Sequence, residues 1–207
     1  MKKLAVFLMI PALAMLMVPA LASADGHHHW GGIHGDYAMS ATGNCLHWWN
    51  DAPTAVWGAS NMVQGFFRFQ RDGTGTVWGN NYPITPPPAT PVCGNGEFSF
   101  DFTYRVTHEG AITVWMKPGS FQGKNLVNGL TFTSDNCGTG EGNRCTLFGM
   151  VSSDYKTMSL ATPVSPDGSH AQGYFFPLLN KTFYANCSIA RILFRVGEID
   201  RDVDGGK

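Results

Sequence analysis

The sequence lacks the motifs that are typical of enzymes. It contains no Gly-x-Ser-x-Gly, no His-Glu-x-x-His and no phosphate-binding glycine loop. Glu97 and Asp101 share one face of a predicted strand, but four positions along a strand span about 13 Å, too far for paired carboxylate chemistry. We therefore expect a protein without catalytic activity.

Charge is also scarce, since 14% of the residues are charged. The first 24 residues hold two of the 14 basic residues and none of the 15 acidic ones, so the remainder carries a net charge of −3. A mildly acidic chain has no general attraction to nucleic acid or anionic lipid. Neither a nucleic-acid partner nor stable membrane insertion after removal of the leader is expected.

The first 24 residues have the pattern of a bacterial signal peptide. A basic start at Met1-Lys2-Lys3 precedes an apolar run from Leu4 to Leu21, and Ala22-Ser23-Ala24 supplies the small residues of a cleavage site. A retained membrane anchor is the alternative, because about 18 apolar residues can span a bilayer. We expect cleavage after Ala24 and export to the periplasm or the extracellular space.

The rest of the chain divides into three parts. Residues 25–34 are a polar, His-rich arm that we expect to be flexible. Residues 35–197 are long enough for one domain with a sizeable core, and residues 198–207 form a polar tail.

The domain shows the period of two residues that is typical of strands. Apolar residues alternate with polar ones from Glu97 to Val106, and no long helical period occurs. Residues 67–78 and 104–115 repeat one pattern, a strand, an acidic-Gly turn and a strand that ends in Trp. Successive hairpins bury one face by closing into a barrel or by pairing with a second sheet. We predict an all-β, antiparallel up-and-down barrel of eight or nine strands, with a β-sandwich as the alternative. The strands are expected near 36–43, 62–70, 74–79, 97–107, 111–117, 127–133, 145–152, 156–162 and 186–196.

The proline-rich stretch Tyr82–Val92 is predicted to interrupt these strands as a rigid surface connection, because proline cannot donate to a central ladder.

Aromatic residues dominate the predicted inner face, and an eight-stranded barrel is either filled by such side chains or holds one small ligand. We predict that a small apolar ligand binds in the interior or at its mouth. A filled barrel with a structural or surface role, through loops at 44–60 and 118–126, is the alternative. The candidate ligand-binding residues are Trp48, Phe67, Phe69, Trp78, Phe100, Phe102, Tyr104 and Trp115.

All five cysteines follow the leader, and disulfides are the default in an oxidising compartment. Cys137 and Cys145 bracket a Gly-rich loop that a disulfide closes easily. An odd count leaves one cysteine free or intermolecular.

Several short motifs together resemble a known family. They are Gly35–Cys45, the turn Asp72-Gly-Thr-Gly75, Phe102–Val106 with its Glu109-Gly110 turn, Ser153–Thr157, and Cys187 in the last strand. In this order they resemble an uncharacterised family of small secreted bacterial proteins with a lipocalin-like barrel. The resemblance implies a disulfide between Cys45 and Cys187, which ties the first strand to the last. With this pair and a second disulfide between Cys137 and Cys145, we expect Cys93 to be left over.

The new N-terminus carries the most definite chemistry. Cleavage after Ala24 exposes Asp25-Gly26-His27, whose α-amine, two amide nitrogens and imidazole can surround Cu(II) or Ni(II) in one plane. His28 and His29 add further imidazoles. The alternative is a polar tail that binds metal only adventitiously.

We predict that the mature protein binds Cu(II) with the visible absorption band of a four-nitrogen complex, because this terminus supplies all four nitrogens. The measurement is a spectroscopic titration. Acetylating the α-amine removes one of the four ligands and should abolish the band, and unchanged tight binding would contradict this geometry.

Overall fold

The structure, a computed structural model, describes residues 33–84, 95–134, 145–162 and 171–197. These residues form strands joined by turns. They include no helix, and therefore none that could cross a membrane. The predicted all-β, antiparallel fold class is confirmed. The strands are β1 (Gly35–Trp49), β2 (Ala52–Phe69), β3 (Thr74–Ile84), β4 (Gly96–Val106), β5 (Ala111–Met116), β6 (Phe121–Asn125), β7 (Thr131–Ser134), β8 (Thr146–Val151), β9 (Thr157–Ala161), β10 (Gln172–Phe176) and β11 (Lys181–Gly197).

Eight of these strands form a closed antiparallel ring. The order is β1-β2-β3-β4-β5-β8-β9-β11, and β11 pairs back onto β1 from Asp36↔Gly197 to Trp49↔Phe183. Because both edges of the sheet meet in this ladder, the ring exposes no long unpaired strand. We call it the upper ring.

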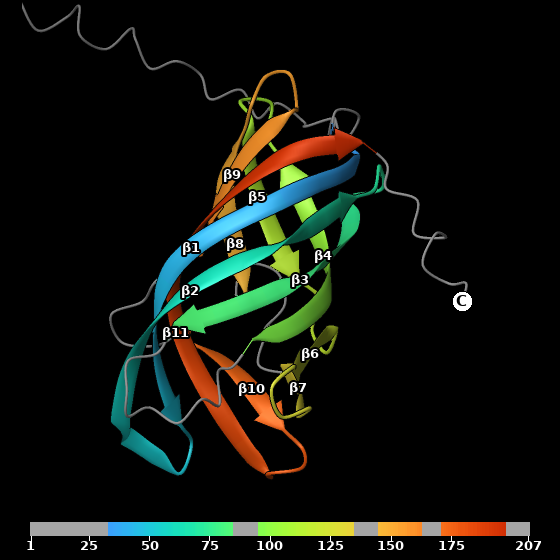
Figure 1. Cartoon of the computed structure of the whole chain (residues 1–207). Helices are drawn as coiled ribbons and strands as arrows, with labels where there is room; N and C mark the ends of the chain where they lie inside the picture. The colour runs from blue at the N-terminus through green and yellow to red at the C-terminus, as the bar shows by residue number, and fades with distance from the viewer. Residues whose placement is uncertain (1–32, 85–94, 135–144, 163–170, 198–207) are drawn as a thin grey trace, which may run out of the picture.

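The sheet forks below the upper ring (Figure 1). The first residues of β4 pair with β6, β6 pairs with β7, β7 with β10, and β10 with the start of β11. A second ring of eight, the lower ring, therefore shares β1, β2, β3, β4 and β11 with the upper one. Three strands, β6, β7 and β10, replace β5, β8 and β9 in it.

The repeat seen in the sequence corresponds to two successive hairpins. β2 and β3 turn at residues 70–73, and β4 and β5 turn at 107–110. Gly73 and Gly110 occupy equivalent turn positions with φ of 81° and 86°, a conformation that favours glycine. The amide of Tyr104 donates to the carbonyl of Gly73, so the first turn is bonded to the second copy of the repeat.

Several local predictions were wrong. β6 and β10 were absent from the predicted strands, and residues 44–60, expected as a loop, are the paired ends of β1 and β2. Pro83, expected in a connection, lies in β3 opposite Asn61. β3 pairs with β4 only as far as Asn81, so the missing N–H of Pro83 breaks no bond to β4.

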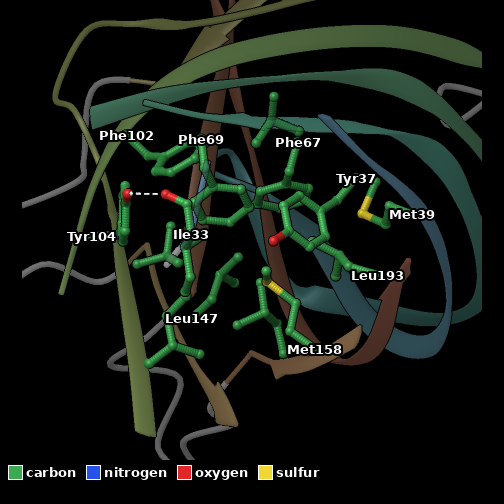
Figure 2. Packing of buried hydrophobic residues seen from close by; sticks show 14 of the residues in the cluster. Ile33, Tyr37, Met39, Phe67, Phe69, Phe102, Tyr104, Leu147, Met158 and Leu193 are labelled. Carbon is green, nitrogen blue, oxygen red and sulfur yellow. Dashed lines mark hydrogen bonds between the residues drawn. The ribbon is translucent and has the colours of Figure 1, made fainter. Parts of the chain in front are cut away.

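The upper ring is filled by a packed core. Phe67, Phe69, Phe102 and Tyr104 lie within contact distance of one another, with ring centroids 5.0–6.1 Å apart. Ile33, a residue of the predicted flexible arm, is buried in this core, and its carbonyl accepts a 3.0 Å hydrogen bond from the Tyr104 hydroxyl (Figure 2). Ile33 therefore belongs to the folded domain, because its apolar side chain packs into the core of the upper ring.

One buried ion pair ties β1 to β2. Asp36 is fully buried, and its two carboxylate oxygens accept hydrogen bonds of 2.7 and 2.8 Å from the guanidinium of Arg68. Arg68 also lies over the ring of Trp78, 5.7 Å from its centroid. A bidentate pair of this kind fixes direction as well as distance, so it helps to set the register at the start of β1.

The disulfide between Cys45 and Cys187 is present and joins directly opposed residues of β1 and β11. Cys145 is also disulfide-bonded, but its predicted partner Cys137 lies outside the described residues, as does Cys93. The Cys45–Cys187 bond closes a loop with a sequence separation of 142 residues.

Replacing both Cys45 and Cys187 by alanine should lower the free energy of unfolding by about 2–5 kcal/mol, because a bond across so long a loop restricts the unfolded chain strongly. Urea denaturation of the double variant measures the loss without reducing the second disulfide. Equal midpoints for the variant and the wild type would show that the β1–β11 ladder alone holds the rings closed.

Candidate ligand-binding cavity

A cavity of about 180 Å³ lies inside the molecule, between the core of the upper ring and the aromatic residues of the lower ring. Its position follows from the fork in the sheet, where β5, β8 and β9 of the upper ring give way to β6, β7 and β10 of the lower ring. Phe67, Val77, Val114 and Leu147 border it from the upper ring, and Phe132, Phe176 and Phe183 border it from the lower ring.

Aromatic side chains make up much of the wall. Phe98, Phe100 and Phe121 stack against one another with centroids 6.1–6.3 Å apart. Phe132 and Tyr174 meet edge to face at 5.7 Å. Phe98, Phe100, Phe132 and Tyr174 are only partly buried although they point inward, because the cavity leaves part of each surface free. An apolar wall of this kind favours an apolar occupant.

His47 forms part of the lower wall and is buried. It stacks with Trp57 at 6.0 Å and lies against Phe183 at 5.0 Å. Burial among these rings lowers the pKa of His47 to about 4, because desolvation disfavours the imidazolium. At neutral pH His47 therefore adds no charge to the cavity.

A few polar groups also face the cavity. The side-chain amide of Asn61 donates to Sγ of Cys45 at 3.0 Å, so one of the disulfide sulfurs has a polar neighbour. Gln172 donates to the hydroxyl of Ser134 and accepts from that of Tyr174. Arg191 lines the cavity from β11.

The structure separates the predicted ligand-binding residues into three groups. Phe67 and Phe100 line the cavity. Phe69, Phe102 and Tyr104 are buried in the core of the upper ring and do not border it.

The third group, Trp48, Trp78 and Trp115, lies on the outer face, which corrects the predicted inward position of Trp78 and Trp115. Trp48 stacks on Tyr184 at 5.7 Å and Trp78 stacks on Phe66 at 5.5 Å. The reason is that successive side chains of a strand point to opposite faces. Val77 points inward, so Trp78 points outward, and Val114 and Met116 point inward on either side of the outward-facing Trp115.

Trp49 takes the inward position beside Trp48 and packs against Phe176 and Phe183 at 5.8 and 5.3 Å. The two adjacent tryptophans therefore face opposite ways, and only one of them contributes to the interior.

The predicted metal-binding residues Asp25 to His29 lie outside the described residues. Within the described part, no three His, Cys, Asp or Glu side chains are grouped as metal ligands would be. His108 and Glu109 form an exposed ion pair at the β4–β5 turn.

Many residues that line the cavity were not among the ligand-binding residues predicted from the sequence. Phe121 and Asn125 lie on β6, where one aromatic residue in five gave no alternating pattern. Phe132, Tyr174 and Phe176 belong to short strands beside turns. The density of aromatic residues in Tyr174-Phe175-Phe176 could have marked this segment as part of the interior. Only the pairing of β10 with β7 and β11 shows that Tyr174 and Phe176 face the cavity.

Comparison with protein-family models and with curated proteins finds no match to this chain.

The buried His47 predicts a pH dependence of stability. Its pKa is about 4 in the folded protein against an ordinary 6.5, so the unfolded chain binds more protons between these values. Stability should therefore fall as the pH drops from 6.5 towards 4, by about 3 kcal/mol in total and about 2 kcal/mol by pH 5.

Urea denaturation of wild type and His47→Phe at pH 7 and pH 5 measures this contribution, and the difference between the two proteins should change by about 2 kcal/mol. Leu46→Phe, which adds the same ring at the exposed neighbouring position of β1 and removes no titratable group, is the matched control and should follow the wild-type pH profile. Parallel pH profiles for wild type and His47→Phe would contradict a buried neutral imidazole.

Proposed function

We propose that this protein is an exported, non-enzymatic binding protein that holds a small apolar ligand in its interior cavity. The observation that carries the proposal is the cavity of about 180 Å³ with its wall of aromatic side chains. Apolar cavities of about 150 Å³ remain dry and bind ligands the size of benzene.

The cavity size limits the ligand. Sites for drug-sized molecules are about 300–1,000 Å³, so an occupant of this cavity is smaller, with one ring or a short acyl chain. The packed core of the upper ring supports this limit, because it closes that end of the interior. Glu97 is the single carboxylate among the described lining residues, which supports binding rather than carboxylate-pair catalysis.

Export is supported by two features. The leader has the three regions of a signal peptide. The disulfide between Cys45 and Cys187 is compatible with an oxidising compartment such as the periplasm or the extracellular space.

A surface-interaction role is a second candidate. It is favoured by apolar side chains on the outer face of β8 and β11, which flank β9. Phe148, Met150, Ile192, Phe194 and Val196 are each about half exposed, at 50–53%. Ser159 of β9 pairs with both Met150 and Ile192, so these two side chains lie in one row across the sheet.

If the cavity binds an apolar ligand, 1-octanol should bind the mature protein with a negative heat-capacity change, because apolar surface is buried on binding. Isothermal titration calorimetry at several temperatures measures the affinity and the heat-capacity change. Ala185→Phe places a ring in the cavity from β11 and should weaken binding about tenfold or more, about 1.4 kcal/mol.

The matched control is Ala190→Phe, which adds the same ring to an exposed position of the same strand and should leave octanol binding unchanged. If octanol fails to bind the folded wild type, the cavity function is excluded and the surface role remains. Equal affinities for wild type and Ala185→Phe would place the ligand elsewhere.

A further inference from the structure

The interior holds one charged group that the apolar cavity does not explain. Arg191 follows the inward-facing Ile189 on β11 by two residues and precedes the buried Leu193 by two. Its side chain is half-buried and forms part of the cavity wall. A guanidinium at such a position loses part of its hydration, which is costly unless a partner replaces it.

The described residues supply few partners to this guanidinium. Both hydrogen bonds of Arg191 come from Nη1, one to the hydroxyl of Thr162 at 2.7 Å and one to the carbonyl of Ile189 at 3.2 Å. No ion pair among the described residues includes Arg191. By contrast, Arg68 has the buried carboxylate of Asp36. Nε and Nη2 of Arg191 have no hydrogen bond to a described residue.

No carboxylate among the described residues compensates this charge. Burial lowers the pKa of Arg191 to about 10, with Tyr174 opposing the shift, so the side chain stays charged at neutral pH. His47 is neutral there because of its low pKa. Glu97 has a half-exposed side chain that lies 4.0 Å from Lys124. The described cavity therefore combines apolar walls with one unpaired positive charge.

We propose that Arg191 binds the carboxylate of an amphiphilic ligand whose short apolar body fills the aromatic part of the cavity. This inference rests on the proposed binding function and adds the class of ligand. The planar guanidinium matches a carboxylate through two parallel hydrogen bonds. One positive charge favours a single negative charge, because a dianionic phosphate would leave an unpaired charge buried.

Polar groups near the fork in the sheet support this placement. Thr162 directly follows β9, Gln172 begins β10 and Ser134 ends β7, so three strand ends bring polar side chains to the level where the two rings separate. Gln172 and Tyr174 are bonded to each other and line the cavity together with Arg191. The head of the ligand thus lies at the fork and its body lies among Phe98, Phe100 and Phe121.

The test compares octanoate, 1-octanol and octylammonium, which share one apolar chain and differ in head charge. Calorimetric titration of the mature protein at neutral pH should give octanoate an affinity about 10- to 100-fold above that of octanol. Octylammonium should bind more weakly than octanol, because like charges repel.

Arg191→Met keeps an unbranched apolar stem and should remove the preference for octanoate while octanol still binds. Arg191→Lys keeps the charge without the planar fork and should retain part of the preference. If Arg191→Met does not fold, a reduced preference for octanoate in Arg191→Lys still tests the role of the guanidinium. The matched control is Arg105→Met, which removes the same charge from an exposed position and should change nothing.

The outcomes separate the two claims. If octanol binds and the wild type does not prefer octanoate, the role of Arg191 is wrong and the apolar binding function stands. A preference that survives in folded Arg191→Met also overturns it. If neither octanol nor octanoate binds, the binding function itself fails.

Discussion

The antiparallel ladder between β1 and β11 joins the first strand of the sheet to the last and closes both rings. β1 pairs with β2 on one side and β11 on the other along nearly its whole length, so the first strand of the ring has no free edge. The Cys45–Cys187 disulfide lies within this ladder and links residues that are directly opposite. Because β1 and β11 run through both rings, one closure defines both. Opening it would expose two long edges and the core between them.

Sharing long strands between two rings also explains why the interior is hollow at one level. The upper ring is filled by a compact aromatic core, and the lower ring brings its own aromatic cluster around Phe176 and Phe183. Between them the short strands end, and the polar residues Ser134, Thr162 and Gln172 lie at three of these strand ends. The cavity is thus a consequence of the fork, with apolar walls and a polar margin.

Arg191 shows how a local departure from pattern relates to function. The strand segment Ile189-Ala190-Arg191-Ile192-Leu193-Phe194 is apolar on both faces apart from the arginine. An alternating pattern would have shown which way Arg191 points, but here both faces are apolar, so the period does not decide it. Its inward position follows from the pairing of Leu193 with Met158 and of Arg191 with Leu160, which are fixed by contacts distant in sequence. Departures of this kind concentrate at functional sites.

The all-β class, the two repeated hairpins and their glycine turns could all be predicted from the sequence, because they depend on a period of two and on local backbone preferences. The resemblance also led to the Cys45–Cys187 pair. Strand pairing and packing between distant parts of the chain were needed to establish that Trp78 and Trp115 point outward, that β6 and β10 are strands and that Ile33 packs at one end of the core. β6 has one aromatic residue in five, so its existence depends on its neighbours β4 and β7. The cavity likewise results from how far each strand extends before it ends, and that length is set by pairing across the whole chain rather than by any local pattern.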